Sequence, residues 1–209
     1  ALIHKLQPAC LIGNNHHKSP FPGEDFQMFE RDLPGENKAG LSGQSISTLP
    51  LETCETMNGM WGYKIKDQNY KSVNELIHLL VRAAGKGANL LMNIGPQPNG
   101  ELPAVAVERL KGVGEWMSKY GETIYGSTSG NVVTASWGTT TRKGNTLYIH
   151  ILSQKMPEFV TLPLNEKVIS ATLFDTGEKV KYEKIQGGIV LHTANLKPSV
   201  DCIISLKLK

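Results

Sequence analysis

The chain has 209 residues, of which 40% are hydrophobic and 20% charged, and its formal net charge is +3. This length is sufficient for one large or two small domains, each with its own core. The basic residues are scattered along the chain, which excludes the concentrated positive stripe of a nucleic-acid-binding protein. No apolar run approaches the ~20 residues that span a bilayer, so we expect no membrane partner.

The first half of the chain alternates between strand-like and helix-like segments. Residues 2–6 look like the end of a helix, and the apolar run over residues 9–12 predicts a short buried strand. A long loop follows, until the alternating pattern of residues 51–56 predicts the next strand. The start of the chain does not resemble a signal peptide.

A capping box then predicts the start of a long helix. The Ser72 hydroxyl can accept a hydrogen bond from the Glu75 N–H, while the Glu75 carboxylate reaches back to Ser72. The chain continues with a glycine stop, a strand and a second helix, over residues 85–87, 89–94 and 103–121.

This order of strands and helices is typical of an α/β fold with a parallel sheet. The first half supplies only about three strands. A closed eight-stranded βα barrel takes ~250 residues by itself, so residues 1–126 can hold only part of such a barrel.

The second half, residues 127–209, contains short strand patterns separated by turns. Five or more short strands at this spacing predict an antiparallel β-sandwich. The predicted strands cover residues 146–152, 159–164, 169–174, 179–184, 189–193 and 202–208.

The loop over residues 13–37 is unusual because it concentrates five carboxylates, three phenylalanines and the adjacent His16 and His17. In βα barrels, the loops that follow the strands build the active site. About 38 residues separate the two predicted strands, and loops of such length are commonly functional. Carboxylates beside aromatic rings suit sugar chemistry, since sugars stack on aromatic faces. The alternative is an acidic, solvated loop.

Metal and disulfide chemistry have weak support. The side chains of His16 and His17 project in different directions, and no third metal-coordinating residue stands at a suitable spacing. We therefore expect no metal or cofactor, and we interpret both histidines as polar residues that hydrogen-bond a bound molecule. The three cysteines, Cys10, Cys54 and Cys202, are an odd number, and we expect buried, unpaired thiols at Cys10 and Cys54, inside predicted strands. The compartment stays undecided.

Several linked motifs resemble the α-L-fucosidases of glycoside hydrolase family 29. They are Leu-Glu-Thr-Cys at residues 51–54, Trp-Gly-Tyr at residues 61–63, and Gly-Ala-Asn-Leu-Leu-Met-Asn-Ile-Gly-Pro at residues 87–96. The resemblance continues through residues 108–125 and becomes looser in the predicted sandwich. Asn99 stands where the family often has Asp, which affects a turn.

The resemblance implies the carboxyl-terminal portion of a (β/α)8-type barrel at residues 1–126, followed by a β-sandwich at residues 127–209. It also implies an exo-acting, retaining hydrolase that acts on fucosylated glycans in the periplasm, the lysosome or outside the cell, and the subunits could form a homo-oligomer. The family's nucleophilic Asp usually lies in a Trp-x-Asp-Gly context, but no Asp-Gly pair occurs here. We therefore expect that this chain lacks its nucleophile, needs the missing barrel half and is inactive alone.

The resemblance places the catalytic acid/base at Glu30. The stretch Asp-Phe-Gln-Met-Phe-Glu at residues 25–30 resembles the family's aromatic segment that ends in this glutamate, and Phe26 and Phe29 flank Glu30 in the sequence. Since this loop varies in length within the family, Glu24 and Glu36 remain alternatives.

The resemblance also assigns the substrate pocket. Trp61 corresponds to a wall of the fucose pocket, and His16 and His17 are weaker candidates for contacts with the sugar. The alternative for Trp61 is a core aromatic residue. The rival function is a non-catalytic carbohydrate-binding or structural module, which fits a chain without a nucleophile.

Overall fold

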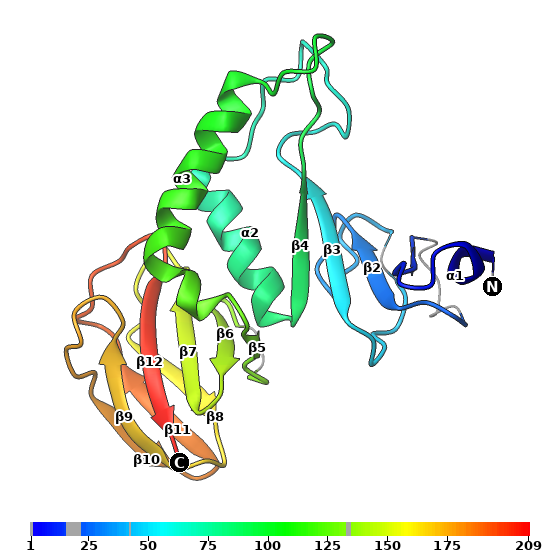
Figure 1. Ribbon diagram of the computed structural model, residues 1–209. Coiled ribbons are helices and arrows are strands. Elements are labelled where there is room, and N and C mark those ends of the chain that lie inside the picture. The colour runs from blue at the N-terminus through cyan, green and yellow to red at the C-terminus, as the bar shows by residue number, and fades with distance from the viewer. Residues whose placement is uncertain (1, 16–21, 42, 133–134) are drawn as a thin grey trace. The chain divides into compact units, whose positions relative to one another are not determined.

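A computed structural model describes residues 2–15, 22–41, 43–132 and 135–209 (Figure 1). The chain divides into two compact units: Ala1–Tyr70 with Ala88–Pro103, and Lys71–Gly87 with Ala104–Lys209. The boundary between residues 126 and 127 stays a prediction, and it differs from this division, which groups the two long helices with the C-terminal strands. No helix within the described residues is long and apolar enough to cross a membrane.

The first unit contains a four-stranded parallel sheet with the order β1-β2-β3-β4. A short helix, α1, precedes it. The elements are α1 (Leu2–Leu6), β1 (Gly13–Asn14), β2 (Phe26–Glu30), β3 (Leu51–Thr56) and β4 (Ala88–Asn93). The predicted parallel pairing is confirmed, and β3 has the predicted bounds.

The structure corrects the prediction of a strand over residues 9–12. These residues are irregular, and pairing begins only at Gly13. Ile12 instead holds the connection to the next strand, because its N–H donates to Asp25 Oδ2 and its carbonyl accepts from the Asp25 N–H, both at 2.7 Å. Cys10 is consequently only half-buried, contrary to expectation, whereas Cys54 and Cys202 are buried and free.

The second strand, β2, lies inside the segment predicted as a loop. Its sequence lacks the usual alternation of apolar and polar residues, because a polar residue, Gln27, occupies an inward position and is only 3% exposed. The Gln27 amide donates to the Ser45 carbonyl and accepts from the Ser47 N–H, each at 2.8 Å. Burial of an amide at low cost therefore depends on partners about 20 residues away.

The second unit begins with two helices, α2 (Val73–Gly85) and α3 (Ala104–Tyr120). The predicted capping box is present, since Ser72 Oγ accepts from the Glu75 N–H and Glu75 Oε2 accepts from the Ser72 N–H. The helices approach closely at Gly112, where an added Cβ would lie 2.7 Å from a Val73 methyl group. Their buried residues pack with the following sheet in one cluster: Ile77, Val81, Trp116, Tyr148, Leu152 and Ile203.

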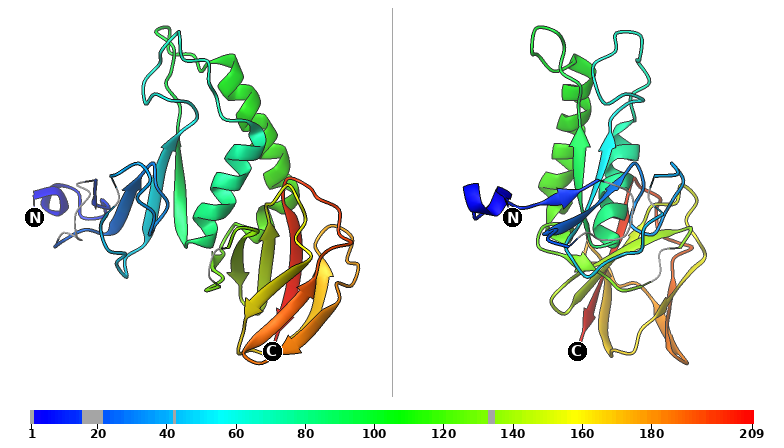
Figure 2. Two further views of the ribbon diagram at one scale, coloured as in Figure 1. Left: turned by 180° about the vertical axis from the view of Figure 1, so that it is seen from behind. Right: turned by 90° about the vertical axis from the view of Figure 1, so that its right-hand side faces the viewer.

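Two antiparallel sheets complete the second unit, with the orders β5-β6-β7-β12-β9 and β10-β11-β8 (Figure 2). Apolar side chains from both sheets form one core, as predicted for residues 127–209. The elements are η1 (Gly121–Thr123), β5 (Thr128–Ser129), β6 (Gly138–Lys143), β7 (Thr146–Ile151), β8 (Phe159–Pro163), β9 (Val168–Leu173), β10 (Tyr182–Ile185), β11 (Gly188–His192) and β12 (Cys202–Leu208).

Strand β6 was absent from the sequence prediction. Three of its buried residues are threonines, Thr139, Thr140 and Thr141, so an apolar period is missing although the strand lies inside the five-stranded sheet, between β5 and β7. Nearby, burial and a hydrogen bond to Glu122 raise the pKa of Tyr148 to about 12, which keeps this phenol protonated as a donor.

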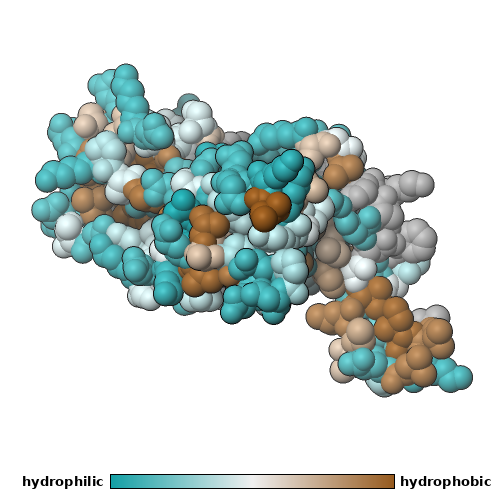
Figure 3. Space-filling view, turned by 90° about the horizontal axis from the view of Figure 1, so that it is seen from above, coloured by the Kyte–Doolittle hydropathy of each residue, from teal (hydrophilic) through white to brown (hydrophobic). Residues whose placement is uncertain are grey.

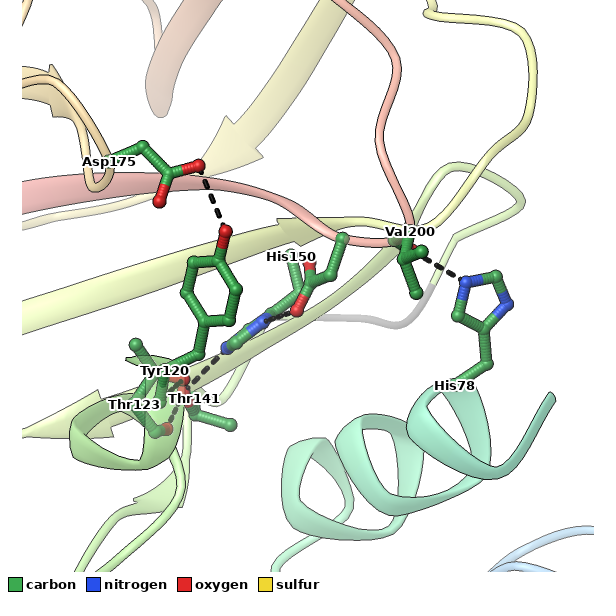
Figure 4. Close-up of polar contacts among 8 residues, drawn as sticks. His78, Tyr120, Thr123, Thr141, His150, Asp175 and Val200 are labelled. Atoms are coloured by element: carbon green, nitrogen blue, oxygen red, sulfur yellow. Dashed lines mark hydrogen bonds and ion pairs between the residues drawn. The ribbon is translucent and has the colours of Figure 1, made fainter. Parts of the chain in front are cut away.

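A fully buried polar chain joins β6, β7, η1 and the residue before β12 (Figure 4). His150 Nδ1 lies 2.7 Å from Asp201 Oδ2, and His150 Nε2 lies 3.0 Å from Thr141 Oγ1. The Thr141 hydroxyl in turn donates to the Thr123 carbonyl at 2.7 Å. The imidazole therefore has a partner on each nitrogen, and it connects two strands, the residue before β12 and a helical turn.

We predict that Asp201→Ala strongly destabilises the second unit. The change leaves the His150 ring without its buried partner, and breaking such a pair typically costs about 3–5 kcal/mol. Urea unfolding followed by circular dichroism measures the effect. Glu183→Ala is the matched control, because it removes an exposed carboxylate from His192 and should change the midpoint little. Equal midpoints for the two variants would contradict the assigned role.

Candidate functional site

The carboxyl ends of β1 to β4 bring polar side chains to one edge of the parallel sheet. Because parallel strands all point in the same direction, residues far apart in the sequence emerge together, and ligands typically bind at this edge. Figure 1 shows the loops after β3 and β4 leaving at the same end. We call this set the carboxyl edge: Asn15, Glu30, Arg31, Thr56, Trp61 and Asn93.

Glu30 is the last residue of β2 and lies on its half-exposed face. Strand alternation buries Gln27 and Phe29 on the opposite face, with Phe29 fully inaccessible. Of the two aromatic neighbours in the sequence, only Phe26 therefore shares the face of Glu30. The Asn15 side-chain amide donates to Glu30 Oε2 at 2.8 Å, which fixes the orientation of the carboxylate.

Arg31 follows Glu30 in a left-handed backbone conformation, with φ of 59°. A residue with a Cβ rarely adopts this conformation, and surrounding contacts must hold it there. Its N–H donates to the Cys54 carbonyl at 2.9 Å, and its guanidinium donates to the Gly59 carbonyl at 3.0 Å. The guanidinium carbon also lies 5.1 Å from the ring centroid of Trp61, within cation–π range.

The loop that carries Trp61 is held by its backbone. Three consecutive carbonyls, at residues 59–61, accept hydrogen bonds of 3.0, 2.8 and 2.7 Å. The donors come from the ends of three neighbouring strands: Arg31 after β2, Thr56 at the end of β3 and Asn93 at the end of β4. The position of the indole is therefore set by the sheet itself.

The charge at the edge also affects Cys54, which pairs with Glu30 in the register of β2 and β3. Burial raises the pKa of the Cys54 thiol, and the Glu30 carboxylate raises it further. A thiol kept protonated in this way is a poor nucleophile, so we assign Cys54 to the core.

The other predicted site residues occupy different places. Glu24 precedes the start of β2, and Glu36 follows its end, where it forms a 2.9 Å ion pair with Lys38. His16 and His17 lie outside the described residues. Among the residues that the structure does describe, no group of three or more His, Cys, Asp or Glu side chains could hold a metal ion.

Sequence reasoning missed Asn15, Arg31 and Asn93. Asn93 could have been found from the sequence, because it is a polar residue near the end of a predicted buried strand. No such signal existed for Arg31, whose role depends on a backbone conformation and on a loop 28 residues away.

A second arrangement superficially resembles a catalytic triad. Thr141, His150 and Asp201 have the hydroxyl, imidazole and carboxylate of a nucleophilic site. However, all three are 2% exposed or less, and the Thr141 hydroxyl donates to a backbone carbonyl. Substrate cannot reach this hydroxyl, so the arrangement is structural.

Comparison with known proteins agrees with the motifs. The sequence profile described as alpha-L-fucosidase matches residues 1–122. An alpha-L-fucosidase of Dictyostelium discoideum is 30% identical over 162 residues, which are 70% of this chain and 35% of that protein. The chain thus spans about a third of this curated relative.

Solved structures are similar over the whole chain. Alpha-L-fucosidase isoenzyme 1 from Paenibacillus thiaminolyticus is 32% identical with a TM-score of 0.79, covering 100% of this chain and 52% of that one. A Bacteroides thetaiotaomicron enzyme, solved as a trapped covalent intermediate with 2-fluoro-fucosyl fluoride in a Glu-to-Gln variant, is 26% identical with a TM-score of 0.80 and coverages of 100% and 51%.

We predict that Arg31→Ala loosens the loop over residues 59–61. The variant loses the hydrogen bond to the Gly59 carbonyl and the contact with Trp61, while the neighbouring donors remain. Hydrogen exchange of the loop amides should accelerate severalfold. Arg31→Gly is the second variant. It relieves the strain of the left-handed backbone conformation and removes the same side chain. If both variants keep wild-type protection, the side chain does not hold the loop.

Proposed function

This chain belongs to the alpha-L-fucosidase family, and on that premise we propose that it forms the carboxyl-terminal part of a retaining, exo-acting α-L-fucosidase. The observation that supports this proposal is the position of Glu30. Of the three candidate glutamates, it alone ends a parallel strand, where it accepts from Asn15, and the next residue, Arg31, contacts Trp61. The substrate is a glycan with a terminal α-L-fucose.

In the proposed mechanism, Glu30 protonates the glycosidic oxygen as the leaving group departs. A carboxylate from outside this chain attacks the anomeric carbon, and Glu30 then removes a proton from the water that releases fucose. The Bacteroides relative, trapped as a covalent intermediate in a Glu-to-Gln variant, supports this division of roles. Asn15 orients the Glu30 carboxylate, and Trp61 forms one wall of the sugar pocket.

The parallel sheet needs further strands to complete such a site. Strands β1 and β4 are the two edges of the four-stranded sheet, and parallel sheets are normally covered or closed. Near β1, Leu2, Leu6 and Leu11 are 69%, 76% and 72% exposed, and Figure 3 shows apolar side chains gathered beside the N-terminus at its lower right. We propose that the missing half of a (β/α)8 barrel, from the same gene product or another chain, covers this surface.

A non-catalytic carbohydrate-binding module is the alternative function. The observation that favours it is the absence of any Asp-Gly pair in the 209 residues. The coding sequence upstream discriminates between the two functions: a barrel half with a Trp-x-Asp-Gly motif supports the enzyme, whereas an unrelated neighbour supports the module.

We predict that the 209-residue chain alone does not hydrolyse an aryl fucoside at an enzymatic rate. A retaining site needs a nucleophile about 5–5.5 Å from the acid/base, and we assign that group to the missing half. Activity should appear when the amino-terminal half is added or fused, and Glu30→Gln should reduce it. Turnover by the chain alone that Glu30→Gln abolishes would overturn the assignment of the missing half.

For the completed enzyme, we predict that Glu30→Ala lowers the rate of hydrolysis of natural oligosaccharides by about 10²–10⁴-fold, because their alcohol leaving groups need a proton. Aryl fucosides with acidic phenols should lose much less in the first step. Added azide should release the fucosyl-enzyme faster, since azide needs no general base.

Glu36→Ala is the control for this experiment, because its carboxylate pairs with Lys38. Glu24→Ala tests whether Glu24 is the acid/base instead. If either control variant shows the azide response while Glu30→Ala cleaves oligosaccharides normally, the acid/base is that other glutamate.

A further inference from the structure

The end of strand β2 is fixed by a buried hydroxyl on the neighbouring strand. Thr53 lies opposite Phe29 in the parallel register of β2 and β3, and it is 1% exposed. Its hydroxyl lies 3.3 Å from the Phe29 carbonyl and also donates to the Asp32 carbonyl. These two carbonyls come directly before and after Glu30 and Arg31. One hydroxyl proton, shared between them, therefore closes the backbone around both residues.

Packing alone does not require a hydroxyl at this position. Valine has nearly the same shape as threonine, suits a buried strand position equally well, and buries no polar side-chain atom. Burial of the Thr53 hydroxyl costs desolvation, and its hydrogen bonds to the two carbonyls compensate that cost. Compared with a valine, the hydroxyl therefore adds a constraint on the turn after β2.

The same turn is also held from its other side, by the side chain of Asp32. This carboxylate is 2% exposed, and it accepts from the Lys38 N–H at 2.9 Å and from the Ala39 N–H at 3.1 and 3.2 Å. The backbone at Asp32 is thus tied to the loop that follows it. The Thr53 hydroxyl consequently binds a carbonyl whose position is already fixed.

These contacts decide where the Glu30 side chain points. Arg31 has the left-handed φ of 59°, and its N–H donates to the Cys54 carbonyl, so the chain leaves the strand immediately after Glu30. The Asn15 amide orients the carboxylate, whereas the Cα–Cβ direction of Glu30 depends on the turn that Thr53 closes. Such placement matters for proton transfer, because a shift of about 1 Å can cost about 10²-fold in rate.

We propose that Thr53 is a positioning residue for Glu30: its hydroxyl holds the turn after β2 so that the Glu30 carboxylate meets the glycosidic oxygen. Thr53 is buried, so it acts through the backbone of β2 and does not touch the substrate. The inference rests on the proposed function, in which Glu30 is the acid/base. Loss of the hydroxyl should impair proton transfer and leave sugar binding intact.

Thr53→Val in the completed enzyme tests the inference, with kcat/KM measured for 2′-fucosyllactose and for an aryl fucoside with an acidic phenol. The value for the oligosaccharide should fall by about 10–10²-fold, because its alcohol leaving group needs the proton. The value for the aryl fucoside should fall by less than about twofold, because an acidic phenol leaves without it. Thr53→Ser keeps the hydroxyl and should retain most of the activity on the oligosaccharide.

Thr140→Val is the matched control. Thr140 is 1% exposed on β6, and its hydroxyl has no hydrogen-bond partner within the described residues. This variant should hydrolyse both substrates like the wild type. Hydrogen exchange of a peptide that covers residues 28–33 gives a readout independent of hydrolysis. Thr53→Val should accelerate this exchange severalfold, and Thr140→Val should leave it unchanged.

Four outcomes overturn the inference: an unchanged oligosaccharide value for Thr53→Val, equal losses for the two substrates, no recovery with Thr53→Ser, or unchanged exchange of residues 28–33. The proposed function is judged by Glu30→Ala in the same assays. If Glu30→Ala loses oligosaccharide hydrolysis and Thr53→Val does not, only this inference fails. If Glu30→Ala hydrolyses the oligosaccharide normally, the proposed function fails, and the inference that rests on it fails too.

Discussion

Parallel pairing of β1 to β4 is the constraint on which the carboxyl edge depends. Because the strands share one direction, Asn15, Thr56 and Asn93 emerge at the same edge as Glu30. The register matters as much as the direction. A slip of one residue in β2 would turn Glu30 toward the buried face and expose Phe29, so the hydrophobic burial of Phe29 also decides where the carboxylate points.

Buried polar groups connect the elements in both units. In the first unit, the Gln27 amide links β2 to the segment around Ser45, and the Thr53 hydroxyl donates to the carbonyls of Phe29 and Asp32. In the second unit, His150 joins strands through Asp201 and Thr141. Such groups are costly unless satisfied, and they therefore restrict the packing to arrangements that pair them.

The two units have different relations to the proposed chemistry. The carboxyl edge holds the residues that we assign to fucose and to proton transfer, and its loop is anchored by strand ends. The second unit contributes no residue to the carboxyl edge, and its buried polar chain through His150 is structural.

The sequence was sufficient to predict the α/β character of the first half, the capped helix at Ser72 and the antiparallel strands of the second half. These features depend on local periodicity and on helix capping, and both involve residues that are close together in the sequence. It also carried the motifs of the family and directed attention to Glu30 and Trp61, whose catalytic and binding roles stay predictions.

Local patterns failed where a buried position is polar. Gln27 in β2 and the threonines of β6 interrupt the apolar period. The Gln27 amide and the Thr141 hydroxyl are satisfied by backbone groups that lie far away in the sequence. The roles of Asn15, Arg31 and Asn93 likewise arise from strand register and from a left-handed turn. Tertiary structure alone decided these contacts, because each joins groups that lie between 15 and 32 residues apart in the chain.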